Sequence, residues 1–210
     1  MKKIIPLFII AISFIVAIFA KPYMPPMMAS HWGINSEVNG YMEKNFGLFF
    51  MPVLSISIYF LFLFLPKIDP YKNNFSQFKN YYDNFIIVIF GFLFYVYLLT
   101  IFWNLGYNFN LVQFLTPAFS LLFYFTGVLT QHTKMNWFVG IRTPWTMSNP
   151  IVWQKTHAIG GKLFKLVGFI SLFGIIFPNL TFYLLFVPII ITVIFVFGYS
   201  YVQYLRYNQE

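Results

Sequence analysis

The chain has 210 residues, of which 60% are hydrophobic and only 9% are charged, whereas soluble domains carry about 25% charged residues. It contains no Cys, which excludes disulfides, thiolate chemistry and cysteine-based zinc sites. The net charge of +8 is spread over several short polar segments and forms no long basic run. We therefore expect no direct nucleic-acid binding, but charges that orient a protein in a membrane and touch anionic lipids.

Apolar runs predict six membrane spans. The charge-free stretches 84–131 and 166–205 are each long enough for two spans of roughly 20 residues, divided at Asn104–Asn110 and at Pro178-Asn179. We therefore expect an all-α polytopic membrane protein whose six transmembrane helices form three hairpins. The expected spans are residues 4–20, 46–65, 84–103, 111–130, 162–177 and 181–204.

The first span follows Lys2 and Lys3 and resembles a signal peptide. Cleavage after Ala20 would need a small residue at the position of Ile18, so we expect a retained span. The chain then divides into an N-terminal helical hairpin, residues 1–65, and a four-helix membrane part, residues 66–210. The second part carries a polar signature loop, residues 131–162.

The distribution of Lys and Arg predicts the orientation. Six spans place ten of these residues on one side of the membrane and only Lys21 and Lys44 on the other, while Lys165 lies within a span. The positive-inside rule then places both termini and the signature loop in the cytoplasm, and residues 21–45 outside. We expect a multi-pass protein of the plasma membrane.

The outer segment, residues 21–45, is predicted to be an irregular loop, because prolines open it and Asn39-Gly40 favours a turn. Its candidate contact residues are His31, Trp32, Gly33 and Lys44. His31 and Trp32 can form an interfacial anchor, a ligand or toxin contact, or a metal site with Glu37 and Glu43. A single histidine in a proline-rich loop lacks the spacing typical of zinc ligands, so we expect no metal.

The signature loop is predicted to contain a short helix that starts at Asn149-Pro150, with Asn as the N-cap and Pro at the first helical position. Residues 151–159 are predicted to lie in the headgroup region with Trp153 as an anchor. Their apolar side comprises Ile151, Val152, Ala158 and Ile159, and the other side carries Gln154 and Lys155. Gly160-Gly161 is expected to bend the chain into the fifth span. Five glycines within the spans are expected to mark close packing between helices: Gly91, Gly127, Gly168, Gly174 and Gly198.

Arg142 and the backbone amides around it can hold a lipid phosphate or a carboxylate. Alternatively, Arg142 caps backbone carbonyls and pins the loop. The segment has no acid, and His157 has no acidic partner nearby in sequence, so we expect no catalytic residue, no cofactor and no enzyme activity. The partner-binding or anion-binding candidates are Asn136, Phe138, Gly140, Arg142, Thr143, Pro144, Trp145, Trp153, Lys155, His157 and Gly161.

The run from Asn136 to Thr146, followed by Trp153, Lys155-Thr156-His157 and Gly160-Gly161, resembles the signature of the SdpI-type membrane proteins. The outer segment resembles the small domain that often precedes that signature, through His31-Trp32, Gly33, Asn39-Gly40-Tyr41, Lys44 and Pro52. The resemblance covers roughly residues 1–65 and 110–205. It departs mildly from the family pattern at Asn39, where an acid is common, and at Ser36, where Pro or Gly is frequent.

This resemblance implies a six-span immunity protein that protects its cell from a secreted toxic peptide. It also implies a second role, in which the toxin-engaged protein recruits a cytoplasmic transcriptional repressor to the membrane. The alternative function is a small transporter or a lipid-binding protein that uses Arg142 for anionic headgroups. The expected spans contain no Asp, Glu, His or Arg, which argues against an ion-coupled transporter. The oligomeric state is left open.

Overall fold

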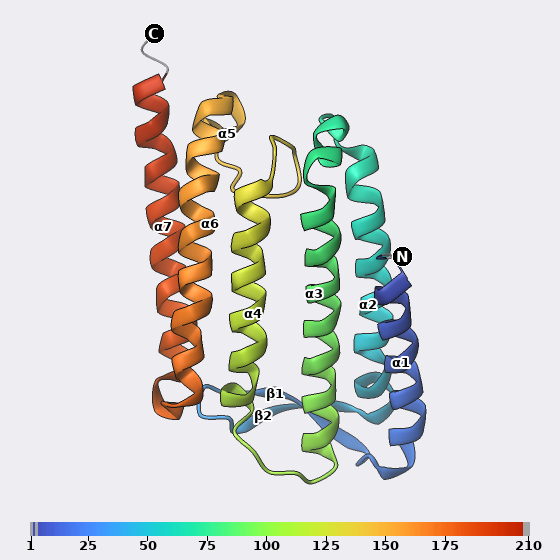
Figure 1. The fold of residues 1–210 in the computed structure, drawn as a ribbon. Helices are drawn as coiled ribbons and strands as arrows, with labels where there is room; N and C mark the ends of the chain where they lie inside the picture. Colours follow the sequence, from blue (N-terminus) through green and yellow to red (C-terminus); the bar gives the residue numbers. More distant parts are fainter. Residues whose placement is uncertain (1, 3, 208–210) are drawn as a thin grey trace.

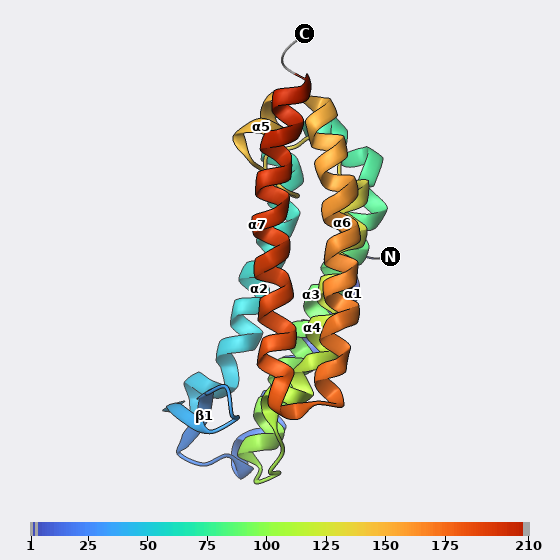
Figure 2. The ribbon, with the colours of Figure 1, turned by 90° about the vertical axis from the view of Figure 1, so that its left-hand side faces the viewer.

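Six long helices lie side by side in the computed structural model, which describes residue 2 and residues 4–207 (Figure 1). Each helix is long and apolar enough to cross a membrane. The bundle is broad in the view of Figure 1 and narrow in that of Figure 2. The prediction of a mostly helical, multi-pass membrane protein is confirmed. The helices are α1 (Ile4–Ala20), α2 (Lys44–Ile68), α3 (Lys72–Asn104), α4 (Leu111–His132), α6 (Pro150–Leu172) and α7 (Thr181–Tyr207).

Two helices begin well before the residues at which hydropathy predicts their first turns. Helix α3 starts at Lys72 rather than at residue 84, and α6 starts at Pro150 rather than at residue 162. Polar residues thus continue a helix beyond its apolar part, because the backbone needs no apolar side chains to remain helical. A separate short helix at 151–159 was therefore a wrong prediction. The short elements are the 3₁₀ turns η1 (Lys21–Tyr23), η2 (Phe173–Ile175) and η3 (Pro178–Leu180), and helix α5 (Pro144–Ser148).

The predicted bend at Gly160-Gly161 is also wrong, because α6 runs through both glycines. A Cβ atom on Gly161 would lie 2.2 Å from Cγ of Gln131 and 2.6 Å from the carbonyl oxygen of Gly127. Such a distance is far below van der Waals contact. Gly161 is therefore needed for close packing of α6 against α4. The expectation of close packing is confirmed at Gly127, Gly168 and Gly174 and is wrong at Gly91 and Gly198, where a Cβ would meet no atom within 4 Å.

The outer segment is a β-hairpin rather than an irregular loop, so the all-α prediction is wrong in this detail. Strand β1 (Met27–Trp32) pairs antiparallel with β2 (Val38–Glu43), and Met28 lies opposite Met42. The turn is formed at residues 33–37, where the Gly33 N–H donates to the Glu37 carbonyl at 2.8 Å. Asn39-Gly40, predicted as the turn, lies within β2, where Gly40 faces His31.

Side chains from the connection between α3 and α4 hold this hairpin in place. The Asn104 amide accepts from the Ala29 N–H at 2.7 Å and donates to the Ala29 carbonyl at 3.0 Å, as a neighbouring strand would. The Ser36 hydroxyl donates to Asn110 Oδ1 at 2.7 Å and accepts from the Val112 N–H at 3.0 Å. The hairpin is thereby fixed to the end of α3 and to the first turn of α4.

The hairpin continues directly into α2 through a carboxylate cap. Both the Asn45 and Phe46 N–H groups donate to Glu43 Oε2, at 2.9 and 3.1 Å. These backbone donors lower the pKa of the Glu43 carboxyl below its usual value. The cap satisfies two of the N–H groups that the first turn of a helix leaves free.

The packing of α4 against α6 gives the first testable prediction. Gly161→Ala should lower the free energy of unfolding by about 1–3 kcal/mol, because the added methyl group must push the two helices apart. Gly91→Ala is the matched control, since a Cβ at Gly91 meets no atom within 4 Å. Denaturation of the purified variants in detergent measures the difference. Equal stability of the two variants would show that α4 and α6 tolerate a wider spacing.

Candidate functional site

Residues 133–143, here called the inner loop, join α4 to α5 without regular secondary structure. Asn136 organises this loop and is fully buried. Its Oδ1 accepts from the N–H groups of Phe138 and Val139 at 2.9 and 2.6 Å, and its Nδ2 donates to the carbonyls of Lys134 and Val139, each at 2.8 Å. One amide side chain thus replaces the backbone partners that a helix or sheet would provide.

His157 anchors the other end of the inner loop from α6 and is 1% exposed. Its Nε2 accepts from the Ile141 N–H at 2.9 Å, so Nδ1 carries the proton and donates to the Trp153 carbonyl at 2.7 Å. A backbone carbonyl, rather than an acid, therefore sets the tautomer. Gly140 has a φ of 118°, and a Cβ there would lie 2.4 Å from Nε2 of His157, so both the backbone and the imidazole require glycine.

Trp153 was expected as an interfacial anchor, and this prediction is wrong because the side chain is only 3% exposed. Its ring stacks on His157 with centroids 3.9 Å apart, and its Nε1 donates to the Thr133 carbonyl at 3.1 Å. The buried face of this helix comprises Val152, Trp153, Thr156, His157 and Gly160. Of the predicted apolar side, Val152 lies on that face, Ile159 is half-buried, and Ile151 and Ala158 are exposed.

Arg142 lies exposed on the loop, and its guanidinium donates to the carbonyl of Trp137. This contact favours the interpretation that Arg142 pins the loop. Thr143 caps α5 in a capping box with Thr146, and Pro144 is the first residue of that helix. The Thr143 hydroxyl also donates to the Ser200 hydroxyl on α7 at 3.0 Å.

Helix α5 is fastened to α7 by an aromatic contact. The ring of Trp145 lies 5.0 Å, between centroids, from both Phe197 and Tyr201. Lys155, in contrast, is exposed on α6 and has its ammonium 5.1 Å from the ring centroid of Tyr207. Among the predicted inner residues, Lys155 and Arg142 are therefore the exposed cations, and most of the others hold the loop in place.

The sequence analysis missed two side chains that tie the inner loop to the neighbouring connection. Asp69, 2% exposed, accepts from the Trp137 N–H at 2.8 Å and from the Tyr71 N–H at 2.6 Å. The Asn74 amide donates to the Met135 carbonyl at 2.7 Å. The sequence contains only five acids, and this rarity was the signal that could have drawn attention to Asp69.

A polar cleft of about 680 Å³, here called the inner cleft, opens between α3, α4 and α6 beside the inner loop. Tyr81 and His132 stack in it with ring centroids 3.7 Å apart. Its lining offers amides, imidazoles and one ammonium group and contains no carboxylate, so it suits a partner rich in hydrogen-bond acceptors. The polar lining includes Asn74, Gln77, Gln131, His132, Lys134 and Gln154. Phe138 instead lines a separate cleft of about 270 Å³ beside Phe62 and Tyr82.

At the other end of the bundle, the structure brings His31, Trp32 and Gly33 together on the hairpin. His31 is exposed and hydrogen-bonds to Asn39 through Nδ1, while Trp32 packs edge-on against Trp103 at 6.0 Å. Lys44 lies half-buried at the start of α2. No three His, Asp or Glu side chains approach closely enough to share a metal ion anywhere in the described part of the chain.

An apolar cavity of about 290 Å³, here called the outer cavity, lies beneath the hairpin between α2, α3 and α4. Trp32 lines it, and the buried indole N–H of this residue has no hydrogen-bond partner among the described residues. An unpaired buried donor is costly, so a ligand with an apolar body and a hydrogen-bond acceptor would find a complementary site here.

Comparisons with known proteins support the resemblance inferred from these residues. The SdpI/YfhL protein family matches residues 132–200, and a domain of unknown function, DUF1648, matches residues 8–56. The chain is 26% identical over 169 residues to "Immunity protein SdpI" of Bacillus subtilis (strain 168), covering 80% of this chain and 79% of that protein. No solved structure matches significantly. The predicted resemblance to the SdpI family is confirmed.

His157 provides the second testable prediction. His157→Phe should cost about 1–3 kcal/mol of stability, because the Ile141 N–H is then buried without an acceptor. His157→Gln should recover part of that loss, since its amide oxygen can accept a hydrogen bond. His132→Phe is the control, as it keeps the stack with Tyr81 and removes only an exposed contact. Thermal unfolding in detergent measures all three variants, and equal losses at both positions would contradict the anchoring role.

Proposed function

We propose that this chain is a membrane immunity protein that protects its cell from a secreted toxic peptide. The observation that carries the proposal is the similarity to an immunity protein over 80% of the chain. The two family models match the segments that contain the hairpin and the inner loop. Six candidate spans support a protein that meets such a peptide at the membrane. The direct test is expression of the chain in a sensitive host, followed by challenge with candidate peptides.

The outer cavity is the best candidate for the contact with the peptide. Its apolar lining includes Trp32, whose indole N–H is buried and has no partner among the described residues. A peptide can supply an apolar side chain to the lining, and a rotation of the indole would bring its N–H to a backbone carbonyl of the peptide. The hairpin is held by hydrogen bonds from Asn104 and Asn110, so the cavity is largely formed before a ligand arrives. Preorganisation of this kind reduces the entropy lost on binding.

Resistance should depend on the indole N–H. Trp32→Phe keeps an aromatic ring in the cavity but removes the donor. We therefore expect the highest peptide concentration that the cells tolerate to fall about tenfold, which corresponds to a net contribution near 1.4 kcal/mol. Trp103→Phe is the control on the neighbouring ring. Growth of host cells across a peptide dilution series measures protection. Unchanged protection by Trp32→Phe would show that this N–H does not contact the peptide.

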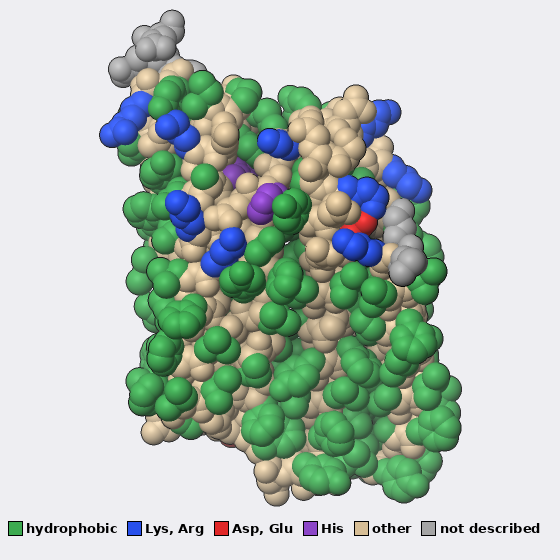
Figure 3. All heavy atoms as spheres, viewed as in Figure 1, with side chains coloured by type: hydrophobic (Ala, Val, Ile, Leu, Met, Phe, Trp, Pro, Cys, Tyr) green, Lys and Arg blue, Asp and Glu red, His purple; other side chains and the backbone are tan. Residues whose placement is uncertain are grey.

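The proposal places both termini and the inner loop in the cytoplasm and the hairpin outside. Figure 3 supports it, since the Lys, Arg and His side chains visible on that face gather toward the end that carries α5. The hairpin end contributes only Lys21 and Lys44 to the basic residues. Anionic lipids and the positive-inside rule favour the cytoplasm for the basic end.

Cysteine labelling tests this orientation in a chain without natural Cys. Asn35 is the position to use on the hairpin, because it is exposed, whereas Ser36 is 8% exposed and has a φ of 64°. An impermeant reagent should label Asn35→Cys in intact cells and leave Ser148→Cys unlabelled until the cells are lysed. The opposite pattern would invert the proposed topology.

A second role, recruitment of a cytoplasmic repressor, is supported by the chemistry of the inner end. Lys134, Lys155 and Lys162 are exposed, and the inner cleft has no carboxylate in its lining. An acidic patch on the partner would complement this surface and would bind less tightly in high salt. The partner would thus dock on side chains that do not hold the inner loop.

Reversing two of these charges should separate recruitment from resistance. With Lys134→Glu and Lys155→Glu combined, membrane association of the repressor should be lost while protection from the peptide persists. Lys72→Glu, compared with Lys134→Glu alone, provides a control of equal charge change at the start of α3. Fluorescence imaging of a tagged repressor reads the first property and growth assays the second. Loss of protection as well would mean that the lysines serve the fold or the peptide.

A further inference from the structure

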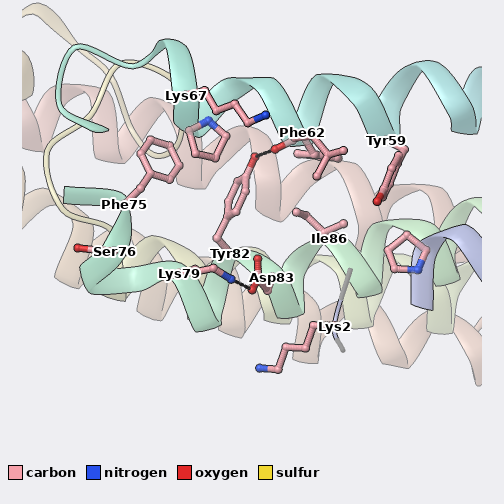
Figure 4. Close-up of a pocket in the computed structure, with 13 residues that line it drawn as sticks. Lys2, Tyr59, Phe62, Lys67, Phe75, Ser76, Lys79, Tyr82, Asp83 and Ile86 are labelled. Carbon is pink, nitrogen blue, oxygen red and sulfur yellow. Dashed lines mark hydrogen bonds and ion pairs between the residues drawn. The ribbon is translucent and has the colours of Figure 1, made fainter. Parts of the chain in front are cut away.

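A cleft of about 290 Å³ lies apart from the inner loop and from the outer cavity, between the start of α1, the last turns of α2 and the first turns of α3 (Figure 4). Its walls are largely apolar and include Phe62, Leu63 and Ile86. Three lysines from three different segments, Lys2, Lys67 and Lys79, also line it. We call it the lysine cleft.

The lysine cleft lies where α2 and α3 extend beyond α1. Helix α1 has 17 residues, whereas α2 has 25 and α3 has 33. Helix α1 begins partway along its neighbours, as Figure 1 shows, and α2 and α3 continue beyond its first turn. Apolar side chains of α2 and α3 in this region line the cleft and can face an occupant from the membrane.

The charge in the lysine cleft is not balanced by the protein. Lys79 is paired with Asp83, one helical turn away on α3. Lys2 donates to the neutral amide of Asn84 at 2.8 Å, and Lys67 lies 5.6 Å from the ring centroid of Phe64. Asp83 is the one carboxylate in the lining, so an excess of positive charge borders an apolar wall.

We propose that the lysine cleft binds one anionic phospholipid of the surrounding membrane. The phosphate of the headgroup contacts Lys67, Lys2 adds positive charge at the opposite edge of the cleft (Figure 4), and an acyl chain lies along Phe62, Leu63 and Ile86. An ammonium group on a flexible stem suits a phosphate as a point charge, and the apolar wall excludes water from the chain. The lipid lies beside the first turn of α1 and joins α1, α2 and α3 at this end.

This proposal does not depend on the immunity role, because it concerns a lipid and not a peptide. The cleft shares no lining residue with the outer cavity or the inner cleft. A lipid held here would stabilise the N-terminal helices against α3 and leave both candidate contact regions free. Loss of peptide resistance in a host assay would therefore leave the lipid site intact.

Binding of phosphatidylglycerol and of phosphatidylcholine with identical acyl chains tests the proposal, using the full chain in detergent and native mass spectrometry. Phosphatidylglycerol should bind more tightly to the wild type. Lys67→Gln should weaken it about fivefold and Lys2→Gln less, and both should affect phosphatidylcholine to a smaller extent, because its choline offsets the charge of its phosphate. Lys155→Gln and Lys162→Gln, made singly, are the controls with the same loss of one charge. Lys79 is left intact, because its removal would strand Asp83.

The apolar half of the site has its own test. Ile86→Trp should fill the cleft and weaken both lipids, and soluble glycerol 3-phosphate should bind far less tightly than phosphatidylglycerol. Equal binding of the two lipids, or equal losses in the control variants, would overturn the proposal. Tight binding of glycerol 3-phosphate alone would indicate a free-phosphate site, and a dimer abolished by Ile86→Trp would show that a second copy of the chain fills the cleft. Should Ile86→Trp not fold, the lysine variants still decide the question.

Discussion

The need to satisfy every backbone polar group governs the inner end of this protein. A segment without helix or sheet beside a membrane must find a partner for each buried N–H and carbonyl. The inner loop finds them in side chains from three places: Asn136 within the loop, His157 on α6 and Asp69 from the connection before α3. The choice of an amide, a neutral imidazole and a carboxylate follows from the donors and acceptors that the loop leaves free.

This constraint separates the residues that hold the signature from those that can be read by a partner. Gly140, His157 and Trp153 are fixed by geometry and burial, so their substitution would disturb the loop before it disturbed any binding. Exposed cations such as Lys134 and Lys155 do not hold the loop in this way. A signature motif in a membrane protein can therefore be mostly architectural while the recognition chemistry lies in the less distinctive residues beside it.

Local features of the sequence predicted much of the fold. The length of the apolar runs predicted the six helices, and Asn149-Pro150 predicted the start of α6, since both features depend only on residues close together in the sequence. Long-range contacts were beyond that reasoning. Trp153 suits a membrane interface and a buried stack equally, and only the position of Thr133 and His157 decides between them. The hairpin was missed for the same reason, because Asn104 supplies partners from 75 positions away.

The two ends of the molecule are joined by a continuous set of contacts through α4. Its first turn hydrogen-bonds to Ser36 of the hairpin, and its middle packs on α6 with Gly127 against Gly161, so little side-chain material can absorb a shift. Helix α6 in turn holds the inner loop through His157. A ligand that displaced the hairpin would shift α4 first, and the close packing would transmit this shift to α6. Close packing of this kind links the hairpin to the inner loop through contacts that leave little room for one to move independently of the other.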